Sequence, residues 1–357
     1  MIKESDIKIN NQMLAIISEL DEFKGSWNLL GQMSPERLKT LKKVATIESI
    51  GSSNRIEGNK LTDNQVEKLL SNIKKQSFAT RDEQEVAGYA RLMDTIFDDY
   101  EVIPLTENYI KQLHKILLQY SEKDEKQRGE YKKISNAVAA YDEKGNELGI
   151  VFDTATPFET PLKMEELVNW TRKNLEDKFF HPLIVIGIFI VEFLAIHPFE
   201  DGNGRLSRAL TCLCLLKADY NYIKYSSLES VIEDNKEGYY RALRQTQTTL
   251  KNKKPDFTPW LMFFLKSLQK QKIRLEYKLN QNNISANSGN SDLSELEYKI
   301  LKYFDENESG TILKLVEYTQ SNRNTVKKAV SSLVYKKYLI LHSKGRGAWY
   351  SKGDNNA

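Results

Sequence analysis

Two apolar stretches near the middle of the chain predict two buried helices. Residues 183–196 and 209–216 are almost entirely apolar, and a short polar segment separates them. The first stretch has fourteen residues, too few to span a bilayer, so a helix in the protein core is the better interpretation. His181 and Pro182, which precede it, are typical of a helix cap and first turn.

Two further segments have the periodicity of amphipathic helices. Residues 35–58 follow a start signal at Ser34 and Pro35 and end at Gly58, which favours helix termination. Apolar residues every third position, Leu38, Leu41, Val44 and Ile47, predict one apolar face there. A second helix begins near Glu107, with His114 among its apolar positions, and we interpret this histidine as a packing or surface residue.

One hairpin and a separate C-terminal region complete the pattern. Residues 136–141 and 148–152 flank a turn at 143–146, which predicts a β-hairpin. Residues 280–291 are polar, lack an apolar stripe and indicate a linker. The segments after it predict three helices and a terminal hairpin, the order of a winged helix-turn-helix domain; they are residues 293–304, 311–320 and 322–337, then 338–342 with 348–350.

Charge is nearly balanced over the whole chain but not at its end. The 357 residues include 52 basic and 49 acidic side chains, so any binding to nucleic acid must be local. From Thr311 onward, nine lysines and arginines face two acids, a net charge of +7. The third C-terminal helix starts with residues suited to the DNA major groove, Arg323, Asn324, Lys327 and Lys328. Winged helices also dock proteins or dimerise, and both readings stay open.

Length and cysteine usage favour a cytoplasmic protein of two or three domains. Cys212 and Cys214 are two residues apart on a predicted helix and face different ways, which disfavours a disulfide or a paired metal site. The first residues are charged rather than typical of a signal peptide, and no apolar run is long enough to cross a membrane. We therefore expect a reducing compartment and no membrane partner.

The polar segment between the two apolar stretches carries the candidate chemistry. Gly202, Asn203 and Gly204 allow the backbone to approach a ligand, and the N-terminus of the following helix favours an anion. Arg205 and Arg208 lie three residues apart and can bind phosphate oxygens. Asp201 is a ligand of the kind that Mg²⁺ takes beside phosphates. His197 can accept a proton from a hydroxyl group.

Residues 197–208 match the signature of the Fic family, His-Pro-Phe-x-(Asp/Glu)-Gly-Asn-Gly-Arg-x-x-Arg, at every position. The chain therefore resembles Fic proteins, which implies a mainly α fold. The resemblance assigns residues 1–90 to an N-terminal helical region and residues 91–279 to an all-helical Fic core. The hairpin at 136–152 would be its flap. The linker at 280–291 and a winged helix-turn-helix domain at 292–357 would follow.

A second motif resembles the inhibitory motif of this family, (Ser/Thr)-x-x-x-Glu-(Gly/Asn). Ser53, Glu57 and Gly58 supply it at the end of the helix predicted at about 35–58. The resemblance implies autoinhibition, in which Glu57 pairs with Arg208 and fills the space that the γ-phosphate of the nucleotide needs. A charge-assisted pair of about 1.5–3 kcal/mol would be strong enough to compete and weak enough to release.

The resemblance also implies a reaction, the transfer of AMP from ATP to a Ser, Thr or Tyr hydroxyl of a target protein or of the protein itself. His197 would be the general base and Asp201 the Mg²⁺ ligand. Backbone N–H groups from Gly202 to Gly204, with the Asn203 side chain, would stabilise charge on the α-phosphate. Arg205 would hold the β-phosphate side and Arg208 the γ-phosphate.

The remaining assignments from the resemblance concern the nucleobase and the target. Leu206 and Ser207 complete the nucleotide-binding stretch, while Tyr239, Tyr240 and Gln247 would form the adenine pocket. The target would add a strand to the flap. Lys132 stands where many relatives carry arginine, so an ion pair there is not implied.

Other functions remain open at the level of sequence. No Gly-x-x-x-x-Gly-Lys-(Ser/Thr) motif occurs, which argues against a P-loop enzyme. Gly204, where the phosphotransferring branch of the superfamily has lysine, favours AMP transfer over phosphoryl transfer. Removal of AMP from a target, or transfer of another nucleotide, uses the same site. A DNA-binding regulator with the Fic core as a sensor is the alternative from another class, and the intact His197 and Asp201 speak against it.

Overall fold

The computed structural model describes residues 2–29, 35–71, 78–141, 147–252, 254–287, 293–343 and 348–353. The chain divides into two compact units, Met1–Lys272 and Ile273–Ala357. Helices dominate both units and each unit has one two-stranded antiparallel sheet, as the predicted mainly α fold requires. Among the described helices, none combines the length and apolar character needed to cross a bilayer.

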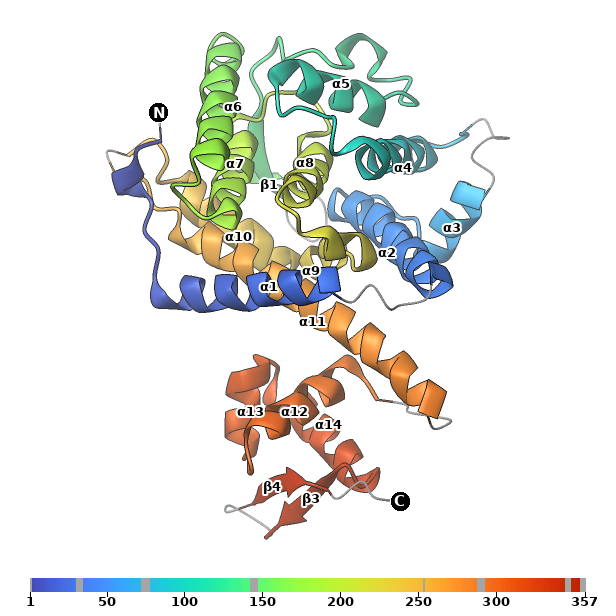
Figure 1. The fold of residues 1–357 in the computed structure, drawn as a ribbon. Coiled ribbons are helices and arrows are strands. Elements are labelled where there is room, and N and C mark those ends of the chain that lie inside the picture. The colour runs from blue at the N-terminus through green and yellow to red at the C-terminus, as the bar shows by residue number, and fades with distance from the viewer. Residues whose placement is uncertain are drawn as a thin grey trace. The chain divides into compact units, whose positions relative to one another are not determined.

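The first unit is a bundle of helices joined by short connections (Figure 1). Its described residues also include short 3₁₀ helices at Glu4–Asp6, Glu125–Gln127 and Asn221–Tyr225. The α-helices are α1 Asn11–Leu29, α2 Pro35–Ile56, α3 Asp63–Ser71, α4 Arg81–Asp99, α5 Glu107–Leu117, α6 Thr160–Asp177, α7 Pro182–Ile196, α8 Asn203–Lys217, α9 Leu228–Glu233, α10 Lys236–Gln247 and the first part of α11 Thr258–Asn287, which continues past the division at Lys272.

Helices α7 and α8 form the centre of this bundle, as the two apolar stretches predicted. Every residue of α7 except Pro182 and Glu192 is buried, and α8 packs against α7, α4, α2 and α5. The expected cap is confirmed, because the His181 side chain accepts a hydrogen bond from the Leu183 N–H group. Gly187 lets α11 approach α7 closely, since a Cβ atom there would lie 2.7 Å from Leu261 Cδ2.

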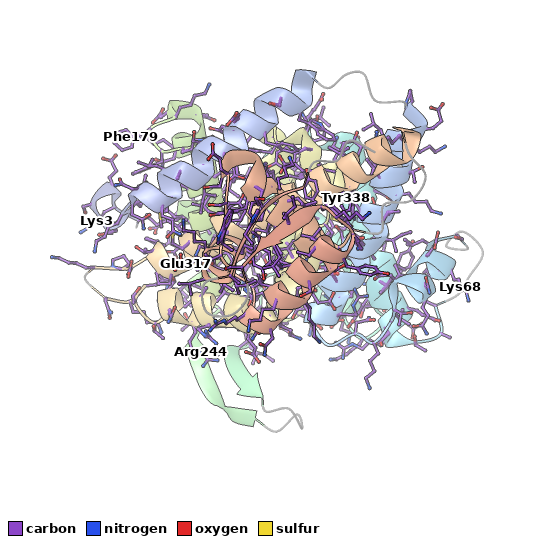
Figure 2. The ribbon with its side chains drawn as sticks, turned by 90° about the horizontal axis from the view of Figure 1, so that it is seen from below. Lys3, Lys68, Phe179, Arg244, Glu317 and Tyr338 are labelled. Carbon is purple, nitrogen blue, oxygen red and sulfur yellow. The ribbon has the colours of Figure 1, made fainter. Side chains whose placement is uncertain are left out.

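The predicted hairpin is present as β1 (Ala137–Tyr141) and β2 (Glu147–Asp153). The strands are antiparallel, and two irregularities in their register mark bulges. Figure 2 shows the hairpin extending beyond the helices of its unit. The predicted turn at 143–146 lies outside the described residues.

Helix α2 confirms the predicted element but not its predicted buried face. Its buried side repeats every four residues, at Leu41, Ala45, Ser49 and Ser53, whereas Val44 is 42% exposed. A three-residue repeat drifts around a helix that has about 3.6 residues per turn, so it does not stay on one face. Small and polar residues form much of the contact with the bundle, which an apolar pattern cannot reveal. The start signal at Ser34 lies outside the described residues.

Two predicted boundaries are wrong. The border at residue 90 falls inside α4, because the N-terminal helices pack into the same unit as the core. Residues 280–287, predicted as part of a linker, continue helix α11. Extending an existing helix costs little, since each added residue gains one backbone hydrogen bond, so polar side chains do not end it. Residues 288–292 lie outside the described part of the chain.

After the end of α11, the described residues of the second unit form three helices followed by a two-stranded sheet, in the predicted order. The elements are α12 Glu295–Glu306, α13 Ile312–Thr319, α14 Arg323–Tyr335, β3 Leu339–His342 and β4 Trp349–Lys352. Its core contains residues from all three helices and β3, including Ile300, Leu315, Val330, Leu333 and Leu339. The Gly310 and Tyr350 backbones exchange hydrogen bonds of 2.9 and 2.8 Å, which tie β4 to the segment before α13.

Candidate active site

The segment between α7 and α8 is a tight loop that begins at His197. This residue ends α7 in the left-handed conformation, with φ 51° and ψ 62°, and its N–H group donates to the Phe193 carbonyl at 2.9 Å. Gly202 has φ 79°, and a Cβ atom there would lie 3.0 Å from Leu117 Cδ2. Glycine is therefore required at that position both for its backbone conformation and for space.

Asn203 holds the loop closed. Its Oδ1 accepts the Phe199 N–H group at 2.9 Å, and its Nδ2 donates to the Phe199 carbonyl at 2.7 Å. Asn136, at the start of the hairpin, donates to the same carbonyl at 3.0 Å. The side-chain amide of Asn203 is thus engaged within the loop at both ends. The expected contact of this side chain with the α-phosphate stays a prediction, and these intraloop hydrogen bonds would have to rearrange for it to form.

His114 of α5 contacts the loop through Phe199 and Asp201. The sequence predicted a packing or surface histidine but not this contact with the loop. His114 is fully buried, and its ring stacks on Phe199 with a centroid distance of 3.8 Å. Nδ1 accepts the Gly129 N–H group at 3.0 Å, so Nε2 carries the proton and donates to the Asp201 carbonyl at 3.0 Å. Burial lowers the pKa of His114 to about 4, which keeps the ring neutral.

His197 presents one unprotonated nitrogen. Its Nδ1 lies 3.3 Å from the Leu194 carbonyl, which can only accept, so Nδ1 carries the proton and Nε2 keeps its lone pair. Burial lowers the pKa of this histidine to about 4, and the contact with Leu194 opposes that shift. A neutral imidazole in this tautomer can accept a proton from a hydroxyl group.

Glu57 occupies the N-terminus of α8. The first hydrogen bond inside this helix runs from Leu206 N to the Gly202 carbonyl at 2.8 Å, which leaves the N–H groups before Leu206 without a helical partner. A Cβ atom on Gly204 would collide with Glu57 Oε1, so the carboxylate lies directly against this turn. The predicted anion site therefore faces a carboxylate of the chain itself.

Arg208 completes the contact with the end of α2. Its Nη2 donates to Glu57 Oε1 and to the Ser53 carbonyl, both at 2.8 Å, and its Nε donates to Ser53 Oγ at 2.9 Å. Burial lowers the pKa of Arg208, but Glu57 outweighs it and the pKa is raised. Gly58, with φ 96°, directs the chain away after α2. Two residues of the proposed inhibitory motif, Ser53 and Glu57, thus contact the last arginine of the signature.

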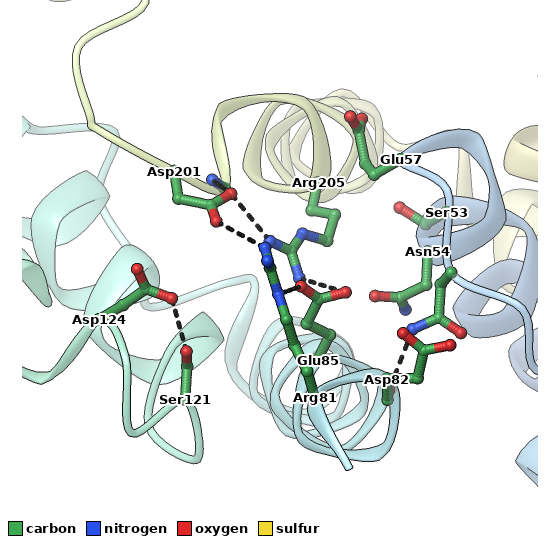
Figure 3. Close-up of polar contacts among 12 residues, drawn as sticks. Ser53, Asn54, Glu57, Arg81, Asp82, Glu85, Ser121, Asp124, Asp201 and Arg205 are labelled. Atoms are coloured by element: carbon green, nitrogen blue, oxygen red, sulfur yellow. Dashed lines mark hydrogen bonds and ion pairs between the residues drawn. The ribbon is translucent and has the colours of Figure 1, made fainter. Parts of the chain in front are cut away.

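Arg205 does not point into the anion site. Its side chain is 3% exposed and lies between Asp201 and Glu85, at 3.1 and 3.6 Å. Arg81 contacts the same two carboxylates: its Nε donates to Glu85 Oε1 at 2.8 Å, and its Nη2 donates to Asp201 Oδ2 at 3.2 Å (Figure 3). The expected contact of Arg205 with the β-phosphate stays a prediction, and it would require this side chain to leave Asp201 or Glu85. In this arrangement the Arg205 guanidinium orients Asp201.

The donor set around Asp201 fits a magnesium ion only when the nucleotide supplies further ligands. Among the residues that the structure describes, no group of three or more His, Cys, Asp or Glu side chains could hold a metal ion. Burial raises the pKa of Asp201, but Arg205, the Gly202 N–H group and Arg81 outweigh it, so the carboxyl pKa is lowered. One ionised carboxylate suits Mg²⁺, which takes most of its ligands from phosphates and water.

The remaining predicted nucleotide contacts are divided between core and surface. Leu206 is fully buried, and Ser207 donates to the Gly204 carbonyl at 2.8 Å, so neither side chain faces the anion site. Tyr239 is 3% exposed and packs on Trp260, and Gln247 is 5% exposed. Tyr240 is 37% exposed and donates to the Ile56 carbonyl at 3.4 Å. Of the three residues expected to form the adenine pocket, Tyr240 alone is exposed.

Lys132 joins the hairpin to the loop. Its side chain is 3% exposed, and Nζ donates to Asn136 Oδ1, Thr154 Oγ1 and the Ile196 carbonyl at 2.8, 2.9 and 2.9 Å. Its backbone N–H group donates to the Pro198 carbonyl at 2.8 Å. Burial lowers the pKa of Lys132 to about 8. This lysine therefore connects the residues next to the open end of the hairpin, Asn136 and Thr154, to the residues on either side of His197.

Residues 104–215 match the Fic/DOC family. Relatives named protein adenylyltransferase Fic include one from Drosophila mojavensis, 26% identical over 206 residues that cover 57% of this chain and 38% of the relative. Another from Drosophila melanogaster is 28% identical over 185 residues, 51% of this chain and 35% of the relative. The chain thus spans little more than a third of the length of these relatives.

Solved structures agree at the level of the fold. A Fic family protein from Desulfovibrio desulfuricans G20 is similar with a TM-score of 0.61 and 21% identity, over 99% of both chains. A Fic domain containing signaling protein from Bacteroides thetaiotaomicron has a TM-score of 0.59 and 24% identity, over 73% of this chain and 97% of that one. The family match over residues 104–215 thus includes the loop, helix α7 and most of α8, and the fold of the chain is similar to that of these Fic proteins.

Proposed function

We propose that this chain is an autoinhibited protein adenylyltransferase, which transfers AMP from ATP to a hydroxyl group of a target protein. The observation that carries the proposal is the position of Glu57. Its carboxylate lies against the first turn of α8 and pairs with the buried Arg208. An anion site that is filled by the chain's own anion supports both parts of the proposal, a phosphate-binding loop and its inhibition.

His197 starts the proposed reaction. Its Nε2 takes the proton from the target hydroxyl, and the freed oxygen attacks the α-phosphorus of ATP. The bond from the α-phosphorus to the oxygen shared with the β-phosphate breaks, and pyrophosphate leaves. Backbone N–H groups at the start of α8 stabilise the charge that develops on the α-phosphate. Magnesium, held by Asp201 and the phosphates, would supply positive charge for the leaving pyrophosphate.

Arg208 binds the terminal phosphate in this proposal once Glu57 has left. Its guanidinium keeps the two contacts with Ser53 only while α2 stays in place. The target adds a strand to the hairpin. Lys132 connects the open end of this hairpin to the loop. The names of the relatives, protein adenylyltransferase Fic, support a protein as the acceptor.

The proposal is tested by incubating the wild type, Glu57→Gly and Glu57→Gly/His197→Ala with ATP and cell lysate. Mass spectrometry should find AMP on hydroxyl side chains after incubation with Glu57→Gly, and far less with the double variant. General-base catalysis typically contributes about 10²- to 10⁴-fold. Unchanged modification without His197 would reject the proposed base. Loss of AMP from proteins that already carry it would favour the alternative function, removal of AMP from a target.

A second function is supported for the C-terminal unit, whose element order suits a winged helix. We propose that helix α14 contacts DNA. Arg323, Asn324, Lys327 and Lys328 are exposed at its start, while Val326 and Val330 face the core. Duplex DNA titrated at two salt concentrations should bind more weakly at the higher one. No binding, or binding independent of salt, would leave protein docking as the role of this unit.

A further inference from the structure

The contact between Glu57 and Arg208 needs support from elsewhere in the fold. Glu57 is 34% exposed as a side chain, whereas Arg208 is 4% exposed, so water reaches one partner of the pair. Among the described hydrogen bonds, the Glu57 carboxylate has a single partner, Arg208. A solvent-accessible ion pair alone is weak. The position of Glu57 therefore depends on what holds the backbone around it.

Arg55, two residues before Glu57, is the best-connected side chain at the end of α2. Its Nε and Nη2 donate to the two carboxylate oxygens of Glu233 at 2.7 and 2.9 Å. Nη1 donates to Asp63 Oδ1 at 2.8 Å and to the Leu61 carbonyl at 3.1 Å, and Nη2 also donates to Ser52 Oγ at 3.2 Å. All five N–H groups of the guanidinium are thus used.

These partners belong to different elements around Glu57. Glu233 is the last residue of α9, whereas Leu61 and Asp63 follow Glu57 in the chain, so Arg55 ties the turn that carries Glu57 to α9 and to the start of α3. The turn itself consists of hydrogen bonds from the N–H groups of Glu57 and Asn59 to the Asn54 carbonyl and from Gly58 N to the Arg55 carbonyl. The Arg55 and Glu233 side chains are 23% and 28% exposed, which limits screening by solvent.

We propose that Arg55 is a positioning residue for autoinhibition, and that its two-pronged pair with Glu233 latches the Glu57 turn over the anion site. This inference rests on the proposed function and adds its regulation. The Arg55–Glu233 latch touches neither the signature loop nor Arg208. An event that separates α9 from α2 would release Glu57 without altering the residues that carry out the transfer.

The test compares Glu233→Gln with the wild type. Glutamine keeps the size of the side chain and removes the charge, so the fold is retained. The same change at Glu237, an exposed residue at the start of α10, is the matched control. AMP transfer should rise about tenfold with Glu233→Gln, the equivalent of one charge-assisted hydrogen bond, and stay at the wild-type level with Glu237→Gln. Transfer at or below the wild-type level with Glu233→Gln would overturn the latch.

The double variant Glu57→Gly/Glu233→Gln separates this role from general stability. Because the latch acts through Glu57, the double variant should transfer AMP at the rate of Glu57→Gly alone. An additional rise in that background would contradict the proposal.

Hydrogen exchange tests the latch independently of AMP transfer. If no variant transferred AMP, the proposed function would be rejected, but the latch could still be tested. The amides of Glu57, Gly58 and Asn59 should exchange faster in Glu233→Gln than in the wild type and in Glu237→Gln. Unchanged exchange of these three amides would overturn the latch independently of catalysis.

Discussion

At the scale of single residues, the site depends on hydrogen bonds that decide which nitrogen of an imidazole carries the proton. The Gly129 N–H group makes Nδ1 of His114 an acceptor, and the Leu194 carbonyl makes Nδ1 of His197 a donor. Each ring is thereby held in one neutral tautomer, and the two tautomers are opposite. His114 supports the loop, whereas His197 keeps a lone pair for the reaction.

Replacing His114 by phenylalanine should destabilise the first unit. The ring can still stack on Phe199, but the Gly129 N–H group and the Asp201 carbonyl lose their partner. Each lost hydrogen bond of a buried group costs about 1–3 kcal/mol. Differential scanning calorimetry at pH 7 should therefore show a lower melting temperature for His114→Phe. An unchanged melting temperature would show that these two hydrogen bonds contribute nothing.

The same histidine predicts a pH dependence. Its pKa is about 4 in the folded protein and about 6.5 when exposed, so the unfolded chain binds more protons between these values. The neutral ring contributes its stability above pH 6.5 and loses it as the pH falls toward 4, by up to roughly 3 kcal/mol. Melting temperatures from pH 7 to pH 5 should fall less steeply in His114→Phe. Parallel curves would contradict this assignment.

At the scale of elements, Lys132 couples the hairpin to the loop. Lys132→Met removes three donated hydrogen bonds while keeping most of the side-chain volume. Transfer to a protein target should fall by about tenfold or more, since misplacing the acceptor is costly in a positioned reaction. ATP affinity, measured by calorimetry on the Glu57→Gly background, should not change.

Two further substitutions make this test specific. Lys133→Met, at an exposed neighbouring position, should have no effect. Lys132→Arg should recover part of the transfer, because a guanidinium can reach the same acceptors. An equal loss of ATP affinity in Lys132→Met would instead indicate general damage to the loop.

The elements also show what the sequence could predict. Apolar runs and cap residues located α7, α8 and the C-terminal helices, because those signals are local. The buried face of α2 was missed because Ser49 and Ser53 face the bundle for their hydrogen bonds and small size rather than for apolar area. Arg55 gave no local signal, since its partner Glu233 is far away in the sequence.

At the scale of the whole molecule, the motif located the candidate site but not the arrangement of its side chains. Glu57 and Arg208 pair as expected, whereas the Arg205 side chain lies between Asp201 and Glu85. That orientation depends on α4, which sequence reasoning divided at residue 90. A border between units is a property of packing, and a composition change does not determine it. The adenine pocket also depends on tertiary packing and stays a prediction.

The central claim is that the loop after α7 transfers AMP and that Glu57 blocks it. The most direct measurement is incorporation of label into protein by Glu57→Gly, supplied in parallel with ATP labelled in the α-phosphate or in the γ-phosphate. The account predicts strong incorporation of the α label, little for the wild type, and none of the γ label. Incorporation of the γ label, or equal α labelling by the wild type and Glu57→Gly, would contradict it.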